Sequence, residues 1–520
     1  MKIERTKNAA RNIVFGLILK LYSIIVPFFM RTAMIYFMGI KYLGLNSLFA
    51  SVLQVLNLAE LGVGSAMVFS MYKPIAEDDD VTICALMKLY RQYYRIIGAI
   101  IAVVGSALTP FIPKLIHGEI PSDINVYILY LMNLGATVLS YWLFAYKNSI
   151  LNAHQRTDVI SKVQLITNTL LFALQFLVLF LFKNYYLYVL ASLLIQALTN
   201  IITAIVSDRL YPKFKPNGNL DKKDVAQINK RIRDLFTSKI GAVVLNSSDT
   251  IVISAFLGLT VLAVYQNYYY ILTAVIGLVG VVFQSCTAGI GNSLITETKE
   301  KNFNDLKKFT FIVSWIGGVC SCCFISVFQP FMKLWMGSDN LLPFSAVICL
   351  VIYYWLYEIN QLLNTYKDAG GLWRQDRFRP LITAIVNLGL NLIMVQFIGI
   401  YGVLLSTVIA FVVIGMPWLF HNLFTLLFDK SYFLGYLKKI LCYLALASIS
   451  STLVRIICLN LPFTGVLEVL VCAIVGFAIP NLLFLIALHR FSEFADCIIL
   501  VDNMTKGKIR LAERVGIKER

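Results

Sequence analysis

Eight ionisable side chains in the 520-residue sequence lie inside long apolar stretches, and two of them, Arg455 and Glu468, lie near the outer ends of the last two stretches. An ionised group at the centre of a membrane span costs roughly 2.5–3.5 kcal/mol, so it normally faces a water-filled cavity or a partner. Basic groups in such a cavity can hold an anion, and carboxylates can hold a cation. We therefore take the other six side chains as candidate substrate-binding residues: Lys20, Arg31, Glu60, Lys239, Asp249 and Glu358.

The spacing of the candidates indicates which of them face a cavity. Lys20 and Arg31 are eleven residues apart, which is three helical turns, and so share one helix face. Lys20 and Lys239 lie well inside their spans, which favours a cavity over snorkelling to the membrane interface. For Arg31 snorkelling stays open, because its span ends soon afterwards. Glu60 could instead pair with Arg31 or Lys20 and hold the first two spans together.

Two further spans carry polar side chains next to a candidate carboxylate. Asp249 ends the polar run Asn246-Ser-Ser-Asp, and Glu358 shares a helix face with Gln361. Charges near the outer ends of the last two spans, Arg455 and Glu468, are better explained by snorkelling. The sequence thus predicts a vestibule lined by charges from spans 1, 2, 7 and 10.

The elements that must position these residues are membrane-spanning helices. Hydrophobic residues make up 59% of the chain and charged residues only 14%, which excludes a soluble fold of this length. A span needs about 20 mostly apolar residues, and the sequence holds about 14 such segments. The predicted fold class is an all-α polytopic membrane protein.

The basic residues predict the orientation of the chain. Lys and Arg number 45 against 28 Asp and Glu, a net charge of +17. With the N-terminus inside, 37 of these 45 fall on inner segments and 4 on outer connectors, as the positive-inside rule requires. We expect a multi-pass protein of the cell membrane with both termini in the cytoplasm. The surplus of positive charge is then topological, and nucleic acid is not an expected partner.

An internal repeat divides the chain after six spans. A shift of 219 positions places Lys20 on Lys239, Gly39 on Gly258 and Gly118 on Gly337. Because six spans separate the equivalents, the halves are predicted to be two parallel six-helix lobes related by a pseudo-twofold axis, followed by two extra helices. The predicted parts are an N-terminal lobe, a basic cytoplasmic linker, a C-terminal lobe, the appended helices 13 and 14, and a basic cytoplasmic tail, at 1–207, 208–234, 235–436, 437–489 and 490–520.

Enzyme and cofactor signatures are missing from the sequence. It contains neither a G-x-x-x-x-G-K-[ST] phosphate loop nor an H-E-x-x-H zinc motif. Most of the ten cysteines lie within apolar stretches with no histidines nearby, which suggests neither a zinc site nor a disulfide framework, and the outer connectors are too short for an active site. We predict no cofactor, no metal and no enzymatic activity.

Several segments resemble one family of exporters. They are Val26-Pro-Phe-Phe-Met-Arg31, Gly39-Ile-Lys-Tyr-Leu-Gly44, Leu58-Ala-Glu-Leu-Gly-Val-Gly64, Asn246-Ser-Ser-Asp249 and Gly289-Ile-Gly-Asn-Ser293. Together with the span count and the repeat, they resemble the polysaccharide repeat-unit flippases of the multidrug/oligosaccharidyl-lipid/polysaccharide exporter superfamily, which export O-antigen-type lipid-linked oligosaccharides.

The resemblance implies a substrate and partners. The cargo would be an oligosaccharide on a polyprenyl pyrophosphate, moved from the cytoplasmic to the outer leaflet for surface or capsular polysaccharide biosynthesis. Lys20, Arg31 and Lys239 could hold its diphosphate. A lysine at position 20, where related flippases offer arginine, keeps the charge but loses the bidentate fork. Polysaccharide polymerase and glycosyltransferases are the implied partners. The alternatives are a drug or metabolite cation antiporter of the same superfamily and an integral-membrane polysaccharide polymerase.

Overall fold

The computed structural model describes residues 5–504, and all regular secondary structure in that range is helical. This confirms the predicted all-α class. The predicted basic tail at 490–520 begins with a described helix, whereas its residues 505–520 lie outside the described part. Contacts divide the chain into two compact units, residues 1–266 and 267–520, which are treated separately below.

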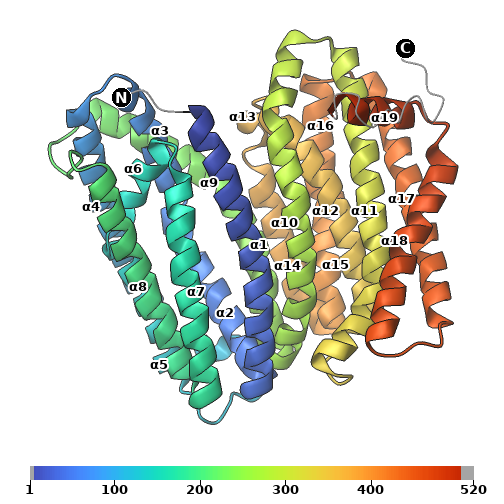
Figure 1. The fold of residues 1–520 in the computed structure, drawn as a ribbon, viewed down its shortest axis with the longest axis horizontal. Coiled ribbons are helices and arrows are strands. Elements are labelled where there is room, and N and C mark those ends of the chain that lie inside the picture. Colours follow the sequence, from blue (N-terminus) through green and yellow to red (C-terminus); the bar gives the residue numbers. More distant parts are fainter. Residues whose placement is uncertain (1–4, 505–520) are drawn as a thin grey trace. The chain divides into compact units, whose positions relative to one another are not determined.

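Unit 1 contains long helices joined by short 3-10 segments (Figure 1). In chain order they are α1 (Arg5–Phe37), α2 (Ile40–Leu56), η1 (Asn57–Glu60), α3 (Val63–Ala76), α4 (Asp80–Leu108), η2 (Thr109–Leu115), α5 (Val126–Trp142), η3 (Ala145–Lys147), α6 (Asn148–Ala153), α7 (Thr157–Leu181), α8 (Tyr185–Leu210) and α9 (Lys222–Leu257). The next helix, α10 (Leu259–Thr296), begins in unit 1 and continues into unit 2.

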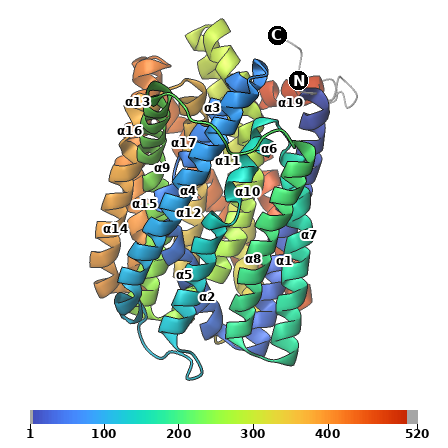
Figure 2. The same cartoon turned by 90° about the vertical axis from the view of Figure 1, so that its left-hand side faces the viewer.

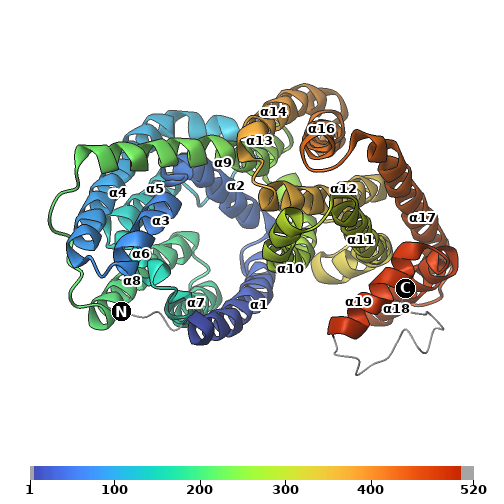
Figure 3. The ribbon, with the colours of Figure 1, turned by 90° about the horizontal axis from the view of Figure 1, so that it is seen from above.

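Unit 2 continues with α11, which packs against α12, α17 and α18. Figure 3 shows the last two of these running side by side within the unit. The elements are α11 (Lys299–Met336), α12 (Phe344–Ala369), α13 (Trp373–Asp376), α14 (Arg379–Ile398), α15 (Ile400–Ala410), a π-helical turn η4 (Phe411–Gly415), α16 (Met416–Leu426), η5 (Lys430–Tyr432), α17 (Phe433–Leu459), α18 (Val466–Leu488) and α19 (Ser492–Met504).

The number of spans agrees with the prediction of about 14. Thirteen described helices are long and apolar enough to cross a membrane, and a bent pair brings the count to as many as 14. The pair is Val126–Trp142 with Ala145–Ala153, and it bends by 48°. The bend coincides with Phe144, whose φ of 56° lies in the left-handed region, where a bulky side chain is unusual. Helices suit the bilayer because they satisfy their own backbone hydrogen bonds.

Two segments predicted as simple spans or linkers have more structure than expected. The second predicted span is interrupted by η1 and by Gly62, whose φ is +88°. A Cβ atom at Gly62 would lie 2.7 Å from the Cβ of Leu235, so only glycine allows α9 to pack this closely. The linker predicted at 208–234 contains the first turns of α9, which begins at Lys222.

The backbone supports the 219-residue repeat. Gly39 and Gly258 stand between consecutive long helices with φ values of +103° and +88°, and Gly118 and Gly337 both have φ +82°. Glycine adopts these conformations without the steric cost that a Cβ atom brings. The same shift relates Asp79 and Thr298, whose side chains accept hydrogen bonds from the third backbone N–H of α4 and α11 at 3.0 and 3.2 Å.

Substituting Gly258 by alanine should destabilise the protein. A new Cβ atom would lie 2.8 Å from the carbonyl oxygen of His117, and the positive φ would cost on the order of 1–3 kcal/mol. Gly135→Ala is the matched control, because it lies inside α5 with no atom within 4 Å of the added carbon. In detergent melts we expect a lower Tm for Gly258→Ala alone. Equal Tm values for the two variants would contradict the expectation.

Candidate functional site

A hydrophilic cavity of about 460 Å³ lies within unit 1, between α1, α6, α7 and α8. Figure 2 shows α1, α7 and α8 side by side along their length. The polar residues that line the cavity are Lys20 and Ser23 of α1, Asn148 of α6, Gln164 and Asn168 of α7, and Gln196, Thr199, Asn200 and Thr203 of α8. Lys20 is the single charged side chain in this lining.

Hydrogen bonds between α1 and its neighbours hold Lys20 at the cavity. Near the start of α1, the Asn12 amide donates to the carbonyl of Gln155 at 3.0 Å, and its oxygen accepts the backbone N–H of Asp158 at 2.8 Å. Half a turn beyond Lys20, the Tyr22 hydroxyl lies 2.9 Å from that of Thr169 on α7. These contacts fix both the height and the rotation of α1 against α7.

Several polar groups of the lining are available to a ligand. The side chains of Lys20, Gln164 and Gln196 are exposed in the cavity, and among the described residues no hydrogen bond or ion pair engages them. The Asn148 Oδ1 atom is buried without a hydrogen-bond partner in the described chain. By contrast, Asn200 donates to the carbonyl of Ser140 at 2.8 Å and so helps to hold the wall in place.

The chemistry of the lining suits an anion that carries hydroxyl groups. An ammonium group supplies three donors and no acceptor, whereas amides both donate and accept. Sugar hydroxyls need both kinds of partner. A cavity with one positive charge and no carboxylate also disfavours a cationic ligand.

Most of the cavity residues escaped prediction because they are uncharged. Their signal in the sequence is a spacing of four within one span: Gln164 with Asn168, Gln196 with Asn200, and Thr199 with Thr203. Residues four apart lie on one helix face, so each pair marks a polar stripe. The sequence alone does not show that the stripes of α7 and α8 face α1.

The other basic candidates of unit 1 lie outside this cavity lining. Arg31 is half-buried on α1, three turns beyond Lys20, and acts electrostatically on Tyr188 of α8. Lys239 is exposed on α9, and its Nζ atom lies 3.4 Å from the Ser65 hydroxyl. The structure therefore brings neither residue into the group of side chains around Lys20.

Tyrosines bind both carboxylate oxygens of Glu60. The hydroxyls of Tyr94 and Tyr141 donate to them at 2.5 and 2.7 Å, and Tyr90 donates to Tyr94 at 2.6 Å. The pairing of Glu60 with Arg31 or Lys20 that the sequence left open does not occur among the described contacts. Glu60 thus joins the break after α2 to α4 and α5.

The remaining two acidic candidates lie in different units. Asp249 is half-buried on α9 in unit 1, beside the buried Ser247, Ser248 and Thr250. Glu358 is on α12 in unit 2, with only 1% of its surface exposed. Both of its carboxylate oxygens are buried without a hydrogen-bond partner in the described chain.

Comparison with known protein families assigns the chain. Residues 9–287, more than half of it, match the model of the polysaccharide biosynthesis protein family. The chain belongs to this family. A search of curated protein sequences gives no significant match.

Solved structures show which fold this chain adopts. The lipid II flippase MurJ, in an inward closed conformation, superposes with a TM-score of 0.67 at 18% identity, over 91% of this chain and 98% of its own. An inward-facing multidrug resistance MATE transporter of the MOP superfamily gives 0.59 at 15%, over 82% and 98%. A MOP superfamily transporter from Pyrococcus furiosus, described by a reversed polarity of its binding pocket, gives 0.51 at 15%, over 84% and 96%.

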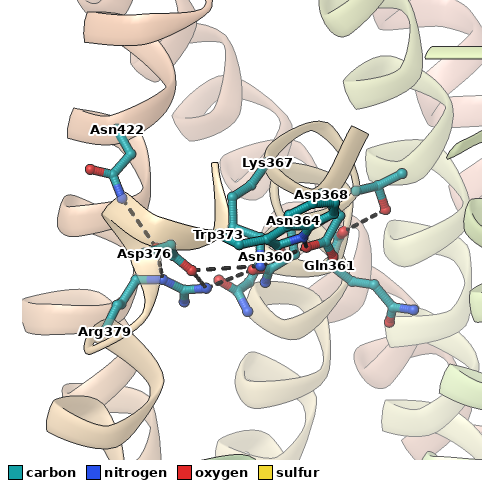
Figure 4. A network of polar contacts seen from close by, with 10 residues as sticks. Asn360, Gln361, Asn364, Lys367, Asp368, Trp373, Asp376, Arg379 and Asn422 are labelled. Carbon is teal, nitrogen blue, oxygen red and sulfur yellow. Dashed lines mark hydrogen bonds and ion pairs between the residues drawn. The ribbon is translucent and has the colours of Figure 1, made fainter. Parts of the chain in front are cut away.

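A second polar cluster joins four helices within unit 2 (Figure 4). Arg379 donates two hydrogen bonds to Asp376, at 2.7 and 2.8 Å, and a third to Asn364 at 2.6 Å. Asn422 donates to Asp376 at 3.2 Å, and the Lys367 ammonium lies 3.6 Å from it. Asp376 and Arg379 are 2% and 5% exposed. The cluster therefore connects α12, α13, α14 and α16.

Breaking this cluster should destabilise unit 2. Asp376→Asn leaves the buried Arg379 without its charge partner, and removing one member of a buried pair costs about 3–5 kcal/mol. The matched control is Asp305→Asn, since Asp305 pairs with Lys308 at 3.0 Å in a more exposed position, where a pair contributes less. We expect a large fall in Tm only for Asp376→Asn. Similar falls for both variants would contradict the assigned role.

Glu358 and Glu60 should respond in opposite ways to replacement by glutamine. Glu358→Gln removes a buried acid without partners, so Tm should stay unchanged or rise. Glu60→Gln weakens two hydrogen bonds from tyrosines, which should cost about 1–3 kcal/mol. Thermal melts of the two purified variants provide the comparison. A fall in Tm for Glu358→Gln as large as that for Glu60→Gln would refute the difference in their environments.

Proposed function

We propose that this chain is a flippase for polyprenyl-pyrophosphate-linked oligosaccharide repeat units. It moves them from the cytoplasmic to the outer leaflet by alternating access, in the biosynthesis of surface or capsular polysaccharide. The observation that carries the proposal is the unit 1 cavity, in which Lys20 is the single charge among amides and hydroxyls. Membership of the polysaccharide biosynthesis family and the fold shared with MurJ support it.

The cavity residues divide the recognition of such a cargo between its two polar parts. The Lys20 ammonium pairs with the diphosphate, as a strongly hydrated point charge that needs no fixed geometry. The amides of Gln164, Asn168 and Gln196 exchange hydrogen bonds with sugar hydroxyls. The prenyl chain stays in the surrounding lipid. Arg31 and Lys239 remain proposed contacts for the diphosphate at another stage of transport. Glu60, Asp249 and Glu358, which lie outside the lining of the unit 1 cavity, are likewise proposed to face the transport pathway only at another stage.

The energetics of export favour this direction for an anionic cargo. With the inside of the cell negative, each negative charge moved outward gains about 2.3 kcal/mol per 100 mV. We place the protein in the cell membrane with both termini in the cytoplasm, because the basic residues concentrate on the inner connectors. The repeat-related lobes at 1–207 and 235–436 are the proposed moving bodies.

The lining disfavours the alternative of a cation antiporter. Such a transporter needs a carboxylate to attract its cargo, and the cavity lining has none. The alternative of a polymerase requires an active site outside the membrane, for which the predicted outer connectors are too short.

Replacing Lys20 should impair export of surface polysaccharide. Lys20→Ala removes a charged partner worth about 1.5–3 kcal/mol, so flipping should slow by roughly tenfold to a hundredfold, whereas Lys20→Arg should keep most of the activity. The measurement is surface polysaccharide in a strain lacking the chromosomal copy, with protein levels followed by immunoblot. In proteoliposomes, a fluorescent lipid-linked oligosaccharide reports flipping directly.

Further variants test the specificity of this result. Lys183→Ala serves as the matched control, because Lys183 is an exposed cation in the connector between α7 and α8. Arg31→Ala and Lys239→Ala test the two other basic candidates. Normal export by Lys20→Ala, at normal protein levels, would overturn the assignment of the cavity. Resistance to a cationic drug conferred by the wild type would support the antiporter instead.

A further inference from the structure

An apolar groove of about 360 Å³ runs along unit 2 between α12 and α17, with α11 as its floor. Phe344, Ile348 and Ile352 line it from α12, and Leu444, Ser448 and Ile456 line it from α17. Phe344 and Trp355, like Leu444 and Arg455, are eleven residues apart. At 1.5 Å per residue each wall is about 16 Å long. This is close to the hydrocarbon depth of one leaflet, about 15 Å.

The polar side chains of the groove, apart from one, have polar atoms that are either hydrogen-bonded within the protein or buried. The hydroxyls of Ser448 and Thr452 donate to carbonyls of their own helix at 2.8 and 2.9 Å, and the Ser451 hydroxyl lies 3.4 Å from the Cys322 sulfur. The polar atoms of Ser321 and Trp355 are buried. The surface that a ligand meets is therefore almost entirely hydrocarbon.

The exception is Arg455 at one end of the groove. Its guanidinium lies 4.0 Å above the centre of the Phe344 ring, and no acidic residue of the described chain, including Glu468 on α18, forms an ion pair with it. This end holds the last turn of α17 and the first turn of α12. The positive-inside rule places it at the outer leaflet.

From these observations we infer that the groove binds one acyl chain of an anionic outer-leaflet phospholipid, whose phosphate is held by Arg455. A guanidinium binds phosphate oxygens with two parallel hydrogen bonds, and the ring of Phe344 holds it at the mouth of the groove. A straight acyl chain matches the length of the walls, whereas a polyprenyl chain is longer and carries methyl branches. The site lies within unit 2 and is independent of the cavity around Lys20.

The charge at its mouth distinguishes this groove from an ordinary contact between a helix and lipid. Any transmembrane helix touches lipid, but an unpaired cation at the end of a chain-length groove selects the headgroup by charge. Bound there, the lipid would join α12 and α17 across the surface of α11. The bound lipid would then help to hold the appended pair α17 and α18 against the other helices of unit 2.

Native mass spectrometry of the full-length protein tests the inference. Purified protein is mixed with phosphatidylglycerol or with phosphatidylcholine of the same chain length, and retained lipid is counted. We expect one phosphatidylglycerol retained in preference to phosphatidylcholine. The Arg455→Gln variant should lose this preference by roughly tenfold, while Lys333→Gln, which removes an exposed cation near the same end of α11, should keep it.

A groove-filling variant keeps the test independent of the charge. Ser448→Phe should abolish retention of both lipids, whereas Ile449→Phe should not, because Ile449 is 63% exposed and outside the groove lining. Unchanged retention by Arg455→Gln or by Ser448→Phe would overturn the inference. Polyprenyl phosphate that displaces phosphatidylglycerol would overturn it in favour of a site for the cargo chain. The assay contains no oligosaccharide, so its outcome does not depend on whether the protein is a flippase.

Discussion

A charge in hydrocarbon must have water or a partner, and the interior of each unit follows from that constraint. The polar N–H and C=O groups of the backbone also need partners there, and they find them by forming helices throughout the described membrane segments. The side chains satisfy the constraint in two ways within the spans: Lys20 faces a hydrophilic cavity, and tyrosine hydroxyls solvate Glu60. At the end of a span, the buried Asp376 and Arg379 neutralise each other. Glu358, buried without a partner in the described chain, is the departure from this pattern.

The two units use their internal space differently. Unit 1 surrounds its cavity with amides and hydroxyls around one ammonium, which suits a hydroxylated anion. In unit 2 the groove beside α17 is apolar with a guanidinium at its mouth, which suits an amphiphile. The proposed flippase needs both kinds of chemistry, because its cargo carries a hydroxylated, anionic head and the surrounding membrane consists of amphiphilic lipids. The two sites can be tested separately, since no residue belongs to both.

The repeat preserves backbone geometry more closely than side-chain environment. Gly39 and Gly258, or Gly118 and Gly337, keep similar positive φ angles at equivalent turns. Lys20 and Lys239 are equivalent in the same register, yet one lines a cavity and the other reaches the Ser65 hydroxyl. Turns between helices demand glycine wherever the backbone repeats. Side chains in the spans are free to diverge because each packs against different neighbours.

The sequence alone determined the all-α membrane class, the approximate span count and the 219-residue register, because hydropathy and glycine positions are local properties. It also predicted that Lys20 and Lys239 face a cavity, and the structure places Lys20, but not Lys239, in the lining of the unit 1 cavity. Only the tertiary structure decided which neutral residues accompany Lys20: Gln164, Asn168 and Gln196 come from α7 and α8, which lie far from Lys20 in the sequence. The tyrosine partners of Glu60 were equally hidden. Such groupings depend on how each helix is rotated about its axis, and packing between helices sets that rotation.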